Sequence, residues 1–172
     1  MEDRFKFVTN KITDITSLQR TIAGWRLKGD RVVFTNGCFD ILHKGHVTYL
    51  AKAASLGERL VVALNTDDSV RRLGKDDNRP INEEDARAMV LASLGFVDGI
   101  VFFNEDTPLE TIVALEPDVL VKGADYDPEE TNPDSKKYIV GSKEVRSNGG
   151  RVEAIDLVQG FSTTAIIEKS KN

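Results

Sequence analysis

Two histidines in the first third of the chain are the strongest candidates for chemistry. They lie in the segment His43-Lys44-Gly45-His46, which follows a short apolar run and opens a helical pattern. A helix N-terminus presents unpaired backbone N–H groups and the positive end of the helix dipole, and both suit a phosphate. Side chains three residues apart at a helix start project to the same side. Two histidines placed in this way can stabilise a phosphoryl group that gains negative charge during substitution.

Other interpretations of these residues are weaker. A His-x-x-His spacing can bind zinc, but the chain has only two histidines and one cysteine, and Cys38 is a poor third ligand. Two histidines can also be ordinary surface residues. Glycines at 37 and 45 and the position after a predicted strand favour phosphate chemistry. The lone Cys38 fits a core or turn position better than a catalytic one, and a single cysteine fits a reducing compartment.

A second candidate phosphate site precedes the last predicted helix. Gly160 permits an unusual backbone angle, and Ser162 is well placed as an N-cap. The three hydroxyls of Ser162-Thr163-Thr164, together with the helix N–H groups, form a possible cradle for phosphate. Capped helices are common, so this segment alone fits a simple N-cap equally well.

A third candidate segment, Lys122-Gly123-Ala124-Asp125-Tyr126, follows the fourth predicted strand. A lysine supplies a compact positive charge for a phosphate, although a charged strand end without a ligand fits these residues equally well. Further candidate phosphate ligands are Lys44, Lys75, Arg79 and Arg87.

The elements that must position these residues alternate between strands and helices. Strands are predicted at 31–35, 58–65, 97–103, 118–122 and 151–155, and helices at 15–27, 45–56, 82–94, from about 108, 138–148 and 162–169. This alternation predicts an α/β fold with a five-stranded parallel sheet and helices on both faces. Ligands bind such sheets beyond the carboxyl ends of the strands, and each candidate segment follows a predicted strand.

The rest of the chain completes the expected organisation. The length of 172 residues suits a single domain, here 1–172, with 1–29 as an N-terminal helical extension. Its helix at 15–27 is expected to cover an edge of the sheet. The polar segments 65–80 and 123–137 resist regular assignment and are candidate lids.

Composition narrows the functional classes. The net charge of −5 argues against a protein built around a nucleic-acid backbone, and no run approaches the roughly 20 apolar residues of a membrane helix. The N-terminal residues lack the apolar stretch of a signal peptide. We therefore expect a cytoplasmic chain with no membrane and no nucleic-acid partner.

On these motifs the chain resembles the cytidylyltransferase-like nucleotidyltransferases that carry a His-x-Gly-His signature. The similarity covers 28–167 and includes 31–46, 77–82, 122–126 and 160–164 in the expected order. Within the family, the chain is most similar to the heptose 1-phosphate adenylyltransferases that form one domain of a bifunctional heptose kinase/adenylyltransferase. Glycerol-3-phosphate cytidylyltransferases share the Gly-x-Ser-Thr-Thr ending.

The resemblance implies a Rossmann-like nucleotidyltransferase fold and a reaction in which AMP passes from ATP to D-glycero-D-manno-heptose 1-phosphate. The products would be pyrophosphate and ADP-heptose for lipopolysaccharide or surface polysaccharide, with Mg²⁺ bridging the triphosphate and no covalent intermediate. Glycerol-3-phosphate cytidylyltransferase, a heptose nucleotidyltransferase using another NTP, and a non-catalytic nucleotide sensor remain alternatives. The resemblance also implies a homo-oligomer, a dimer or larger. No kinase half is recognised in the sequence, so the sugar 1-phosphate is expected from a separate enzyme.

The same resemblance assigns the site residues. His43 and His46 would be catalytic, assisted by Lys44 and Lys122. Nucleotide-binding positions would be Asn36, Gly37, Cys38, Phe39, Gly45, Asn65, Arg87, Gly123, Asp125, Gly141, Val145, Gly160, Phe161, Ser162, Thr163 and Thr164. Substrate-binding positions would be Asp40, Lys75 and Arg79. Asp40 is also a candidate for the metal, and no other side-chain metal ligand is expected. The family's Arg-Tyr-Val-Asp-like segment reads Leu94-Gly95-Phe96-Val97-Asp98 here, so an arginine role there passes to Arg87 only by analogy.

Overall fold

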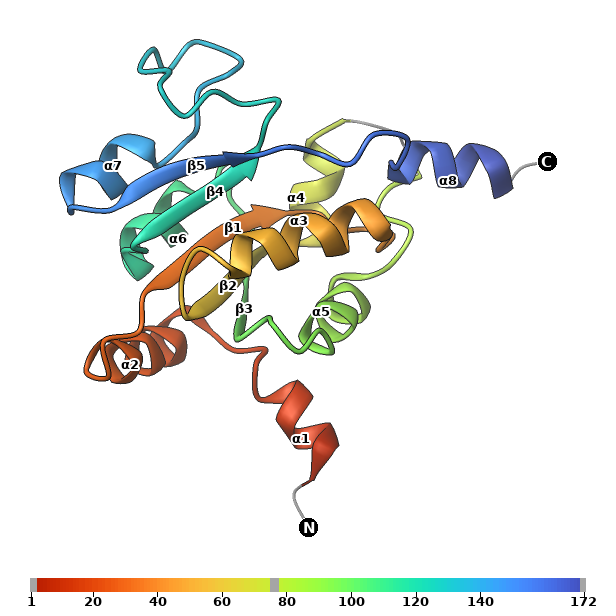
Figure 1. Cartoon of the computed structure of the whole chain (residues 1–172). Helices are drawn as coiled ribbons and strands as arrows, with labels where there is room; N and C mark the ends of the chain where they lie inside the picture. The colour runs from red at the N-terminus through yellow and green to blue at the C-terminus, as the bar shows by residue number, and fades with distance from the viewer. Residues whose placement is uncertain (1–2, 75–77, 171–172) are drawn as a thin grey trace.

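A single parallel sheet organises the computed structural model, which describes residues 3–74 and 78–170. Its strands are β1 (Val32–Gly37), β2 (Arg59–Asn65), β3 (Gly99–Phe103), β4 (Val119–Gly123) and β5 (Arg151–Ile155). They lie in the order β3-β2-β1-β4-β5, and every neighbouring pair is parallel (Figure 1). The predicted α/β class and five-stranded parallel sheet are confirmed.

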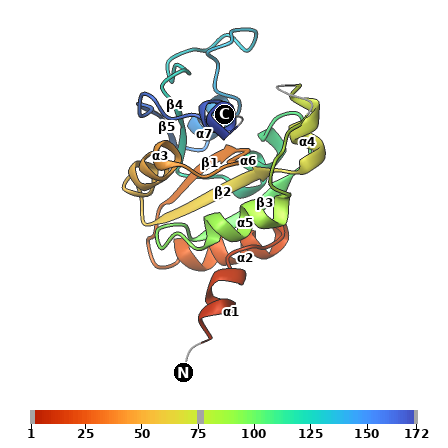
Figure 2. The same ribbon diagram turned by 90° about the vertical axis from the view of Figure 1, so that its right-hand side faces the viewer.

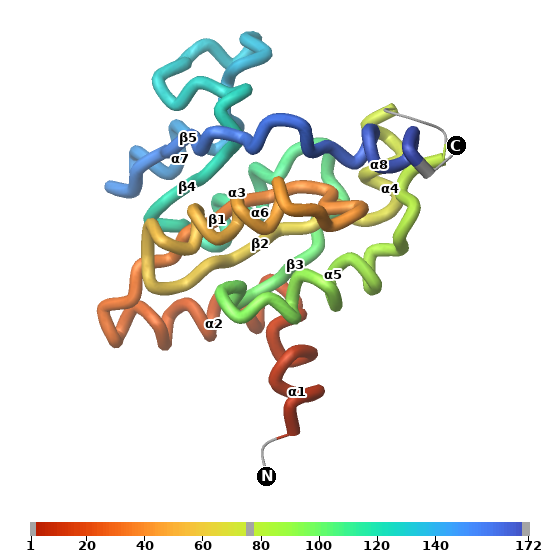
Figure 3. The backbone as a smooth tube through the Cα atoms, turned by 45° about the vertical axis from the view of Figure 1, so that its right-hand side comes forward, coloured from red at the N-terminus to blue at the C-terminus, as the bar shows by residue number. Residues whose placement is uncertain are grey.

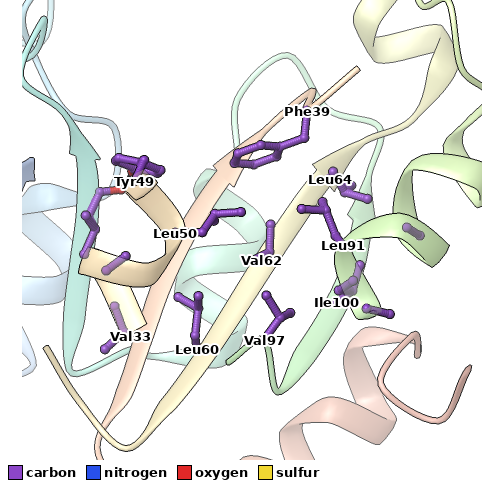
Figure 4. Packing of buried hydrophobic residues seen from close by; sticks show 14 of the residues in the cluster. Val33, Phe39, Tyr49, Leu50, Leu60, Val62, Leu64, Leu91, Val97 and Ile100 are labelled. Atoms are coloured by element: carbon purple, nitrogen blue, oxygen red, sulfur yellow. Dashed lines mark hydrogen bonds between the residues drawn. The ribbon is translucent and has the colours of Figure 1, made fainter. Parts of the chain in front are cut away.

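Both faces of the sheet are buried, which explains why its central strands are almost continuously apolar. One face packs under α3 (Lys44–Ala54) and α5 (Glu84–Ala92). Figure 4 shows Leu50 and Tyr49 of α3 above Leu60 and Val62 of β2. The other face packs against α2 (Ile15–Arg26), α6 (Leu109–Leu115) and α7 (Ser142–Ser147) (Figures 1 and 2).

The helix α2 corrects one expectation, because it covers a face of the sheet and not an edge. Its buried Leu18 and Ile22 pack in the same cluster as Val61 of β2. The β3 edge is instead paired by the chain before α2: the N–H of Thr13 donates to the carbonyl of Ile100 at 3.0 Å. The short helix α1 (Arg4–Thr9) buries no side chain and projects away from the sheet (Figures 1 and 2).

A second correction concerns the segment 65–80, which was expected to be irregular. It contains α4 (Asp67–Arg72), whose N-cap Thr66 accepts a hydrogen bond from the N–H of Ser69. Acidic residues occupy its first turn and basic residues its last, as the helix dipole favours. The helix buries only two side chains, so it shows almost no apolar periodicity in the sequence.

The helix expected at 138–148 is shorter than predicted. It begins only at Ser142, because Gly141 has a φ of +86° in the left-handed region and interrupts the backbone there. The last helix, α8 (Thr163–Ser170), extends beyond the carboxyl ends of the strands (Figure 1). Within the described ranges, no helix is long and apolar enough to cross a membrane.

Candidate active site

A cavity of about 730 Å³ opens at the carboxyl ends of the strands. The strand order reverses between β1 and β4, and ligands of open α/β sheets bind beside such a switch point. The cavity wall takes Asn36 from β1, Asn65 from β2 and Lys122 from β4, and Ser162 and Thr163 from the start of α8. All three candidate segments of the sequence therefore contribute to one cavity.

The two histidines are held in a fixed arrangement at the start of α3. His43 is the N-cap residue, and its Nδ1 accepts a hydrogen bond of 3.3 Å from the N–H of His46. Their rings stack with centroids 3.7 Å apart. Because Nδ1 of His43 is an acceptor, the proton of the neutral ring lies on Nε2. That Nε2 is buried and has no hydrogen-bond partner in the described part of the chain, so it is a donor available to an oxygen atom in the cavity.

Both histidines favour the neutral form. Burial lowers the pKa of His43, and burial together with the neighbouring His43 lowers the pKa of His46 to about 4, although the backbone of Ile41 partly opposes this shift. Neutral imidazoles can stack at this distance because they avoid the repulsion of two like charges.

The depressed pKa of His46 predicts a pH-dependent loss of stability. Between pH 6.5 and about 4 the unfolded chain binds a proton at residue 46 that the folded chain does not. The free energy of unfolding therefore falls as the pH falls through this window, and residue 46 contributes nothing to the slope above it. Urea unfolding of His46→Asn and the wild type across this window checks this. The variant should lose less stability, whereas parallel curves would contradict the assignment.

Aromatic and glycine residues pack closely around the pair. Phe39 meets His46 edge-on with centroids 5.2 Å apart, and Phe161 lies 6.5 Å from His43. Figure 4 shows Phe39 at the end of β1, at the upper limit of the core. A Cβ at Gly45 would lie 2.9 Å from Cε1 of His43 and 3.2 Å from Cβ of Phe161.

The substitution Gly45→Ala is therefore expected to displace the His43 ring. Turnover should fall by about 10-fold or more, because small misplacements of catalytic groups are costly. Gly24→Ala is the matched control, since a Cβ there meets no atom within 4 Å. Steady-state kinetics on both variants tests this, and equal turnover in the two would show that the ring tolerates the shift.

A buried hydrogen-bond chain joins β1 to β4 below the cavity. The hydroxyl of Tyr49 lies 2.8 Å from the Thr35 hydroxyl and donates to the carbonyl of Val121 at 3.1 Å. Burial raises the pKa of Tyr49, so the phenol stays protonated and remains a donor. Next to it, the Nζ of Lys122 lies 5.4 Å from the centroid of the Tyr126 ring.

The structure places most of the predicted residues on the cavity wall. These are His43, His46, Lys122, Asn36, Gly37, Cys38, Phe39, Gly45, Asn65, Gly123, Asp125, Phe161, Ser162, Thr163, Thr164 and Arg79. Asp40 lines a second, smaller cavity. Lys75 lies outside the described residues.

Other predicted residues lie away from both cavity walls. Lys44 is exposed, with its Nζ 5.4 Å from the centroid of the Phe161 ring. Gly160 is exposed in the turn before α8. Its φ of +80° lies in the left-handed region and lets the chain turn there. Val145 is buried in the core, and Gly141 fits closely against Ile112.

The structure places Arg87 elsewhere than its expected nucleotide-binding position. Its side chain is buried and donates to the carbonyls of Cys38 and Asn65 and to the Asp67 carboxylate, at 2.7–2.8 Å. It supports the loops that carry the site but does not line the cavity.

Sequence reasoning missed several wall residues. Tyr49, Leu73, Phe103, Asp106, Thr107, Pro108, Tyr138 and Val140 also line the cavity. Residues 106–108 follow the third predicted strand, so the strand-end rule that selected the other segments also applied to them. Tyr49 gave no comparable signal, because an aromatic residue inside a helix is typical of the core.

The chain resembles known proteins over most of its length. Residues 34–169 match the family model described as Cytidylyltransferase-like. The Bifunctional protein HldE of Azorhizobium caulinodans is 53% identical over 150 residues, which cover 87% of this chain and 29% of that protein. That of Shewanella amazonensis is 56% identical over 143 residues, covering 83% and 28%. The chain thus spans less than a third of the length of these curated relatives.

Two solved structures are also similar to this chain. A lipopolysaccharide core biosynthesis protein from Thermoplasma volcanium is 28% identical with a TM-score of 0.56, over 75% of this chain and 97% of that one. The pantoate-beta-alanine ligase of Francisella tularensis is 14% identical with a TM-score of 0.59, over 93% of this chain and 76% of that one, and shows the fold alone. With its histidine pair at the switch point and its match over 34–169, this chain belongs to the cytidylyltransferase-like family.

Proposed function

We propose that this chain transfers AMP from ATP to D-glycero-D-manno-heptose 1-phosphate and releases pyrophosphate. One observation carries the proposal: the buried, unpaired Nε2 of His43 and the hydroxyl-rich start of α8 face the same cavity. Two phosphate-binding elements on one cavity suit a triphosphate better than a single anion. The similarity to HldE proteins and to a lipopolysaccharide core biosynthesis protein supports a heptose acceptor.

In the proposed mechanism the residues position and stabilise, and none becomes covalently modified. An oxygen of the acceptor phosphate attacks the α-phosphorus, and the bond to the bridging oxygen breaks as pyrophosphate leaves with the electron pair. His43 and His46 donate to the oxygens of the α- and β-phosphates, whose charge increases in the transition state. Ser162, Thr163 and Thr164 bind the remaining phosphates at the α8 N-terminus, and Lys122 adds positive charge.

In the proposed reaction, Mg²⁺ binds together with ATP. In the described part of the chain, no group of three or more His, Cys, Asp or Glu side chains is arranged to hold a metal ion. Mg²⁺ that accompanies a nucleotide is commonly held by substrate phosphates and water, so the proposed reaction does not require a metal site made of side chains. When bound, Mg²⁺ would neutralise charge on the triphosphate.

The proposal also covers assembly and place of action. ATP as the substrate suits the cytoplasm. We propose a homo-oligomer, dimer or larger, for which the exposed Phe5 and Phe7 of α1 offer an apolar surface. Light scattering coupled to size-exclusion chromatography measures the mass of the assembly, and a monomer at working concentrations would contradict this part.

The decisive experiment incubates the protein with each NTP and either heptose 1-phosphate or glycerol 3-phosphate, and measures pyrophosphate. We expect release with ATP and heptose 1-phosphate. Release only with CTP and glycerol 3-phosphate would show that the acceptor is glycerol 3-phosphate and that the nucleotide is CTP. Nucleotide binding without release in any combination would indicate a sensor.

A further inference from the structure

A second cavity of about 190 Å³ adjoins the first. Six residues line both cavities: Cys38, Phe39, His46, Leu73, Arg79 and Thr163. Resting on the proposed function, in which the start of α8 binds the terminal phosphates, we propose that Arg79 is a ligand of these phosphates and of the leaving pyrophosphate. Arg79 thus serves the triphosphate and not the sugar acceptor.

Arg79 carries a donor that pairs with none of the described residues. Its Nη2 donates to the hydroxyl of Thr164 at 3.1 Å, and its Nε is buried with no hydrogen-bond partner among them. A buried, unsatisfied donor on a charged group is costly. The guanidinium fork matches the oxygens of a phosphate, so a phosphate in this cavity would satisfy the Nε and replace the weaker contact to a neutral hydroxyl.

Asp40 fixes the segment that carries Arg79. Its carboxylate accepts hydrogen bonds from the N–H groups of Ile81 and Asn82 at 2.9–3.0 Å, and its carbonyl accepts one of 2.6 Å from Nδ2 of Asn82. The negative charge of Asp40 is thus directed at backbone amides. Because Asp40 lies three residues before His43, it ties the Arg79 segment to the loop that carries the histidines. Asp40 is a positioning residue.

The remaining walls favour an anion. The buried Nδ1 of His46 has no hydrogen-bond partner within residues 3–74 and 78–170. Thr163 is the first residue of α8, whose N-terminus carries partial positive charge. Figure 3 shows α4 and α8 at the same end of the sheet. Among the described residues that line this cavity, Asp40 is the only acidic one.

This placement gives the triphosphate a direction. The α-phosphate lies against the histidine pair in the larger cavity, and the chain of phosphates continues past His46 towards Arg79. When the bond between the α-phosphorus and the bridging oxygen breaks, the electron pair goes to pyrophosphate, whose added charge then lies beside the Arg79 guanidinium.

Binding measurements on Arg79→Gln test the assignment. The ligands are the α,β-methylene analogue of ATP, AMP and inorganic pyrophosphate, each with Mg²⁺, measured by titration calorimetry on the full chain. We expect the Kd for the analogue and for pyrophosphate to rise by about 10- to 100-fold, as for the loss of a charge-assisted hydrogen bond. The Kd for AMP should not change. Arg71→Gln is the control, because Arg71 is exposed, pairs with Asp68 and lines neither cavity.

Several results would overturn the assignment. Equal losses for AMP and the analogue would place Arg79 at the nucleoside or in the fold, and unchanged Kd values for all three would remove it from the site. A rise only in the KM for the acceptor would indicate that Arg79 binds the sugar acceptor. Pyrophosphate binding needs neither base nor acceptor, so the subsite can hold even if heptose 1-phosphate proves to be the wrong substrate.

Discussion

Replacing His46 by alanine is expected to lower kcat by about 10²- to 10³-fold, the usual cost of losing one preorganised group that stabilises transition-state charge. His46 stacks on His43 at 3.7 Å, and its backbone N–H orients the His43 ring. The substitution keeps that N–H and removes only the ring. Affinity for the uncleavable ATP analogue should fall less than turnover, because the interaction strengthens as charge develops.

Pre-steady-state and steady-state kinetics with saturating ATP separate the two effects. Lys52→Ala is a matched control on the same helix, since Lys52 is exposed and lies outside both cavities. Thermal unfolding of both variants checks that α3 is intact. Unchanged turnover in His46→Ala would rule out the proposed role of the pair, and equal losses in turnover and ATP affinity would make His46 a simple binding residue.

The sequence predicted the sheet well because its strands are buried on both faces and strongly apolar. The strand at 151–155 has the same limits in the structure, and the others shift by one or two residues. The helix α4 was not predicted because it buries only two side chains, so its sequence pattern is polar. Local composition thus predicts elements that face the core and misses short elements that lie on the surface.

The site shows the same division. Most site residues directly after strands were found, because the fold gathers the carboxyl ends of the strands in one place. Residues 106–108 follow the same rule but were missed. The role of Asp40 in anchoring residues 81 and 82 depends on a contact across 41 positions of the chain, and no local pattern encodes such a contact. The same holds for Arg87, which reaches the ends of β1 and β2 from α5.

Arg87→Met is expected to lower the free energy of unfolding by about 3–5 kcal/mol, the cost of removing one partner of a buried ion pair. The Arg87 side chain has 0% exposure and Asp67, its partner at 2.8 Å, has 17%. The substitution keeps an unbranched apolar stem but removes the guanidinium, which leaves Asp67 and the carbonyls of Cys38 and Asn65 without their donors. The loss combines these unpaired buried acceptors with the space that the missing guanidinium leaves.

Urea unfolding compares this variant with Arg71→Met, which breaks an arginine–aspartate pair at 60% and 73% exposure. Such an exposed pair contributes about 0–1 kcal/mol, so the two variants differ mainly in the burial of the ion pair. Arg87→Lys should recover only part of the stability, because one ammonium cannot reproduce the fork that joins three loops. If Arg87→Met kept its stability and lost only ATP affinity, Arg87 would be a direct nucleotide ligand. If Arg87→Met loses stability and Arg71→Met does not, Arg87 is the support on which the Cys38 and Asn65 walls depend.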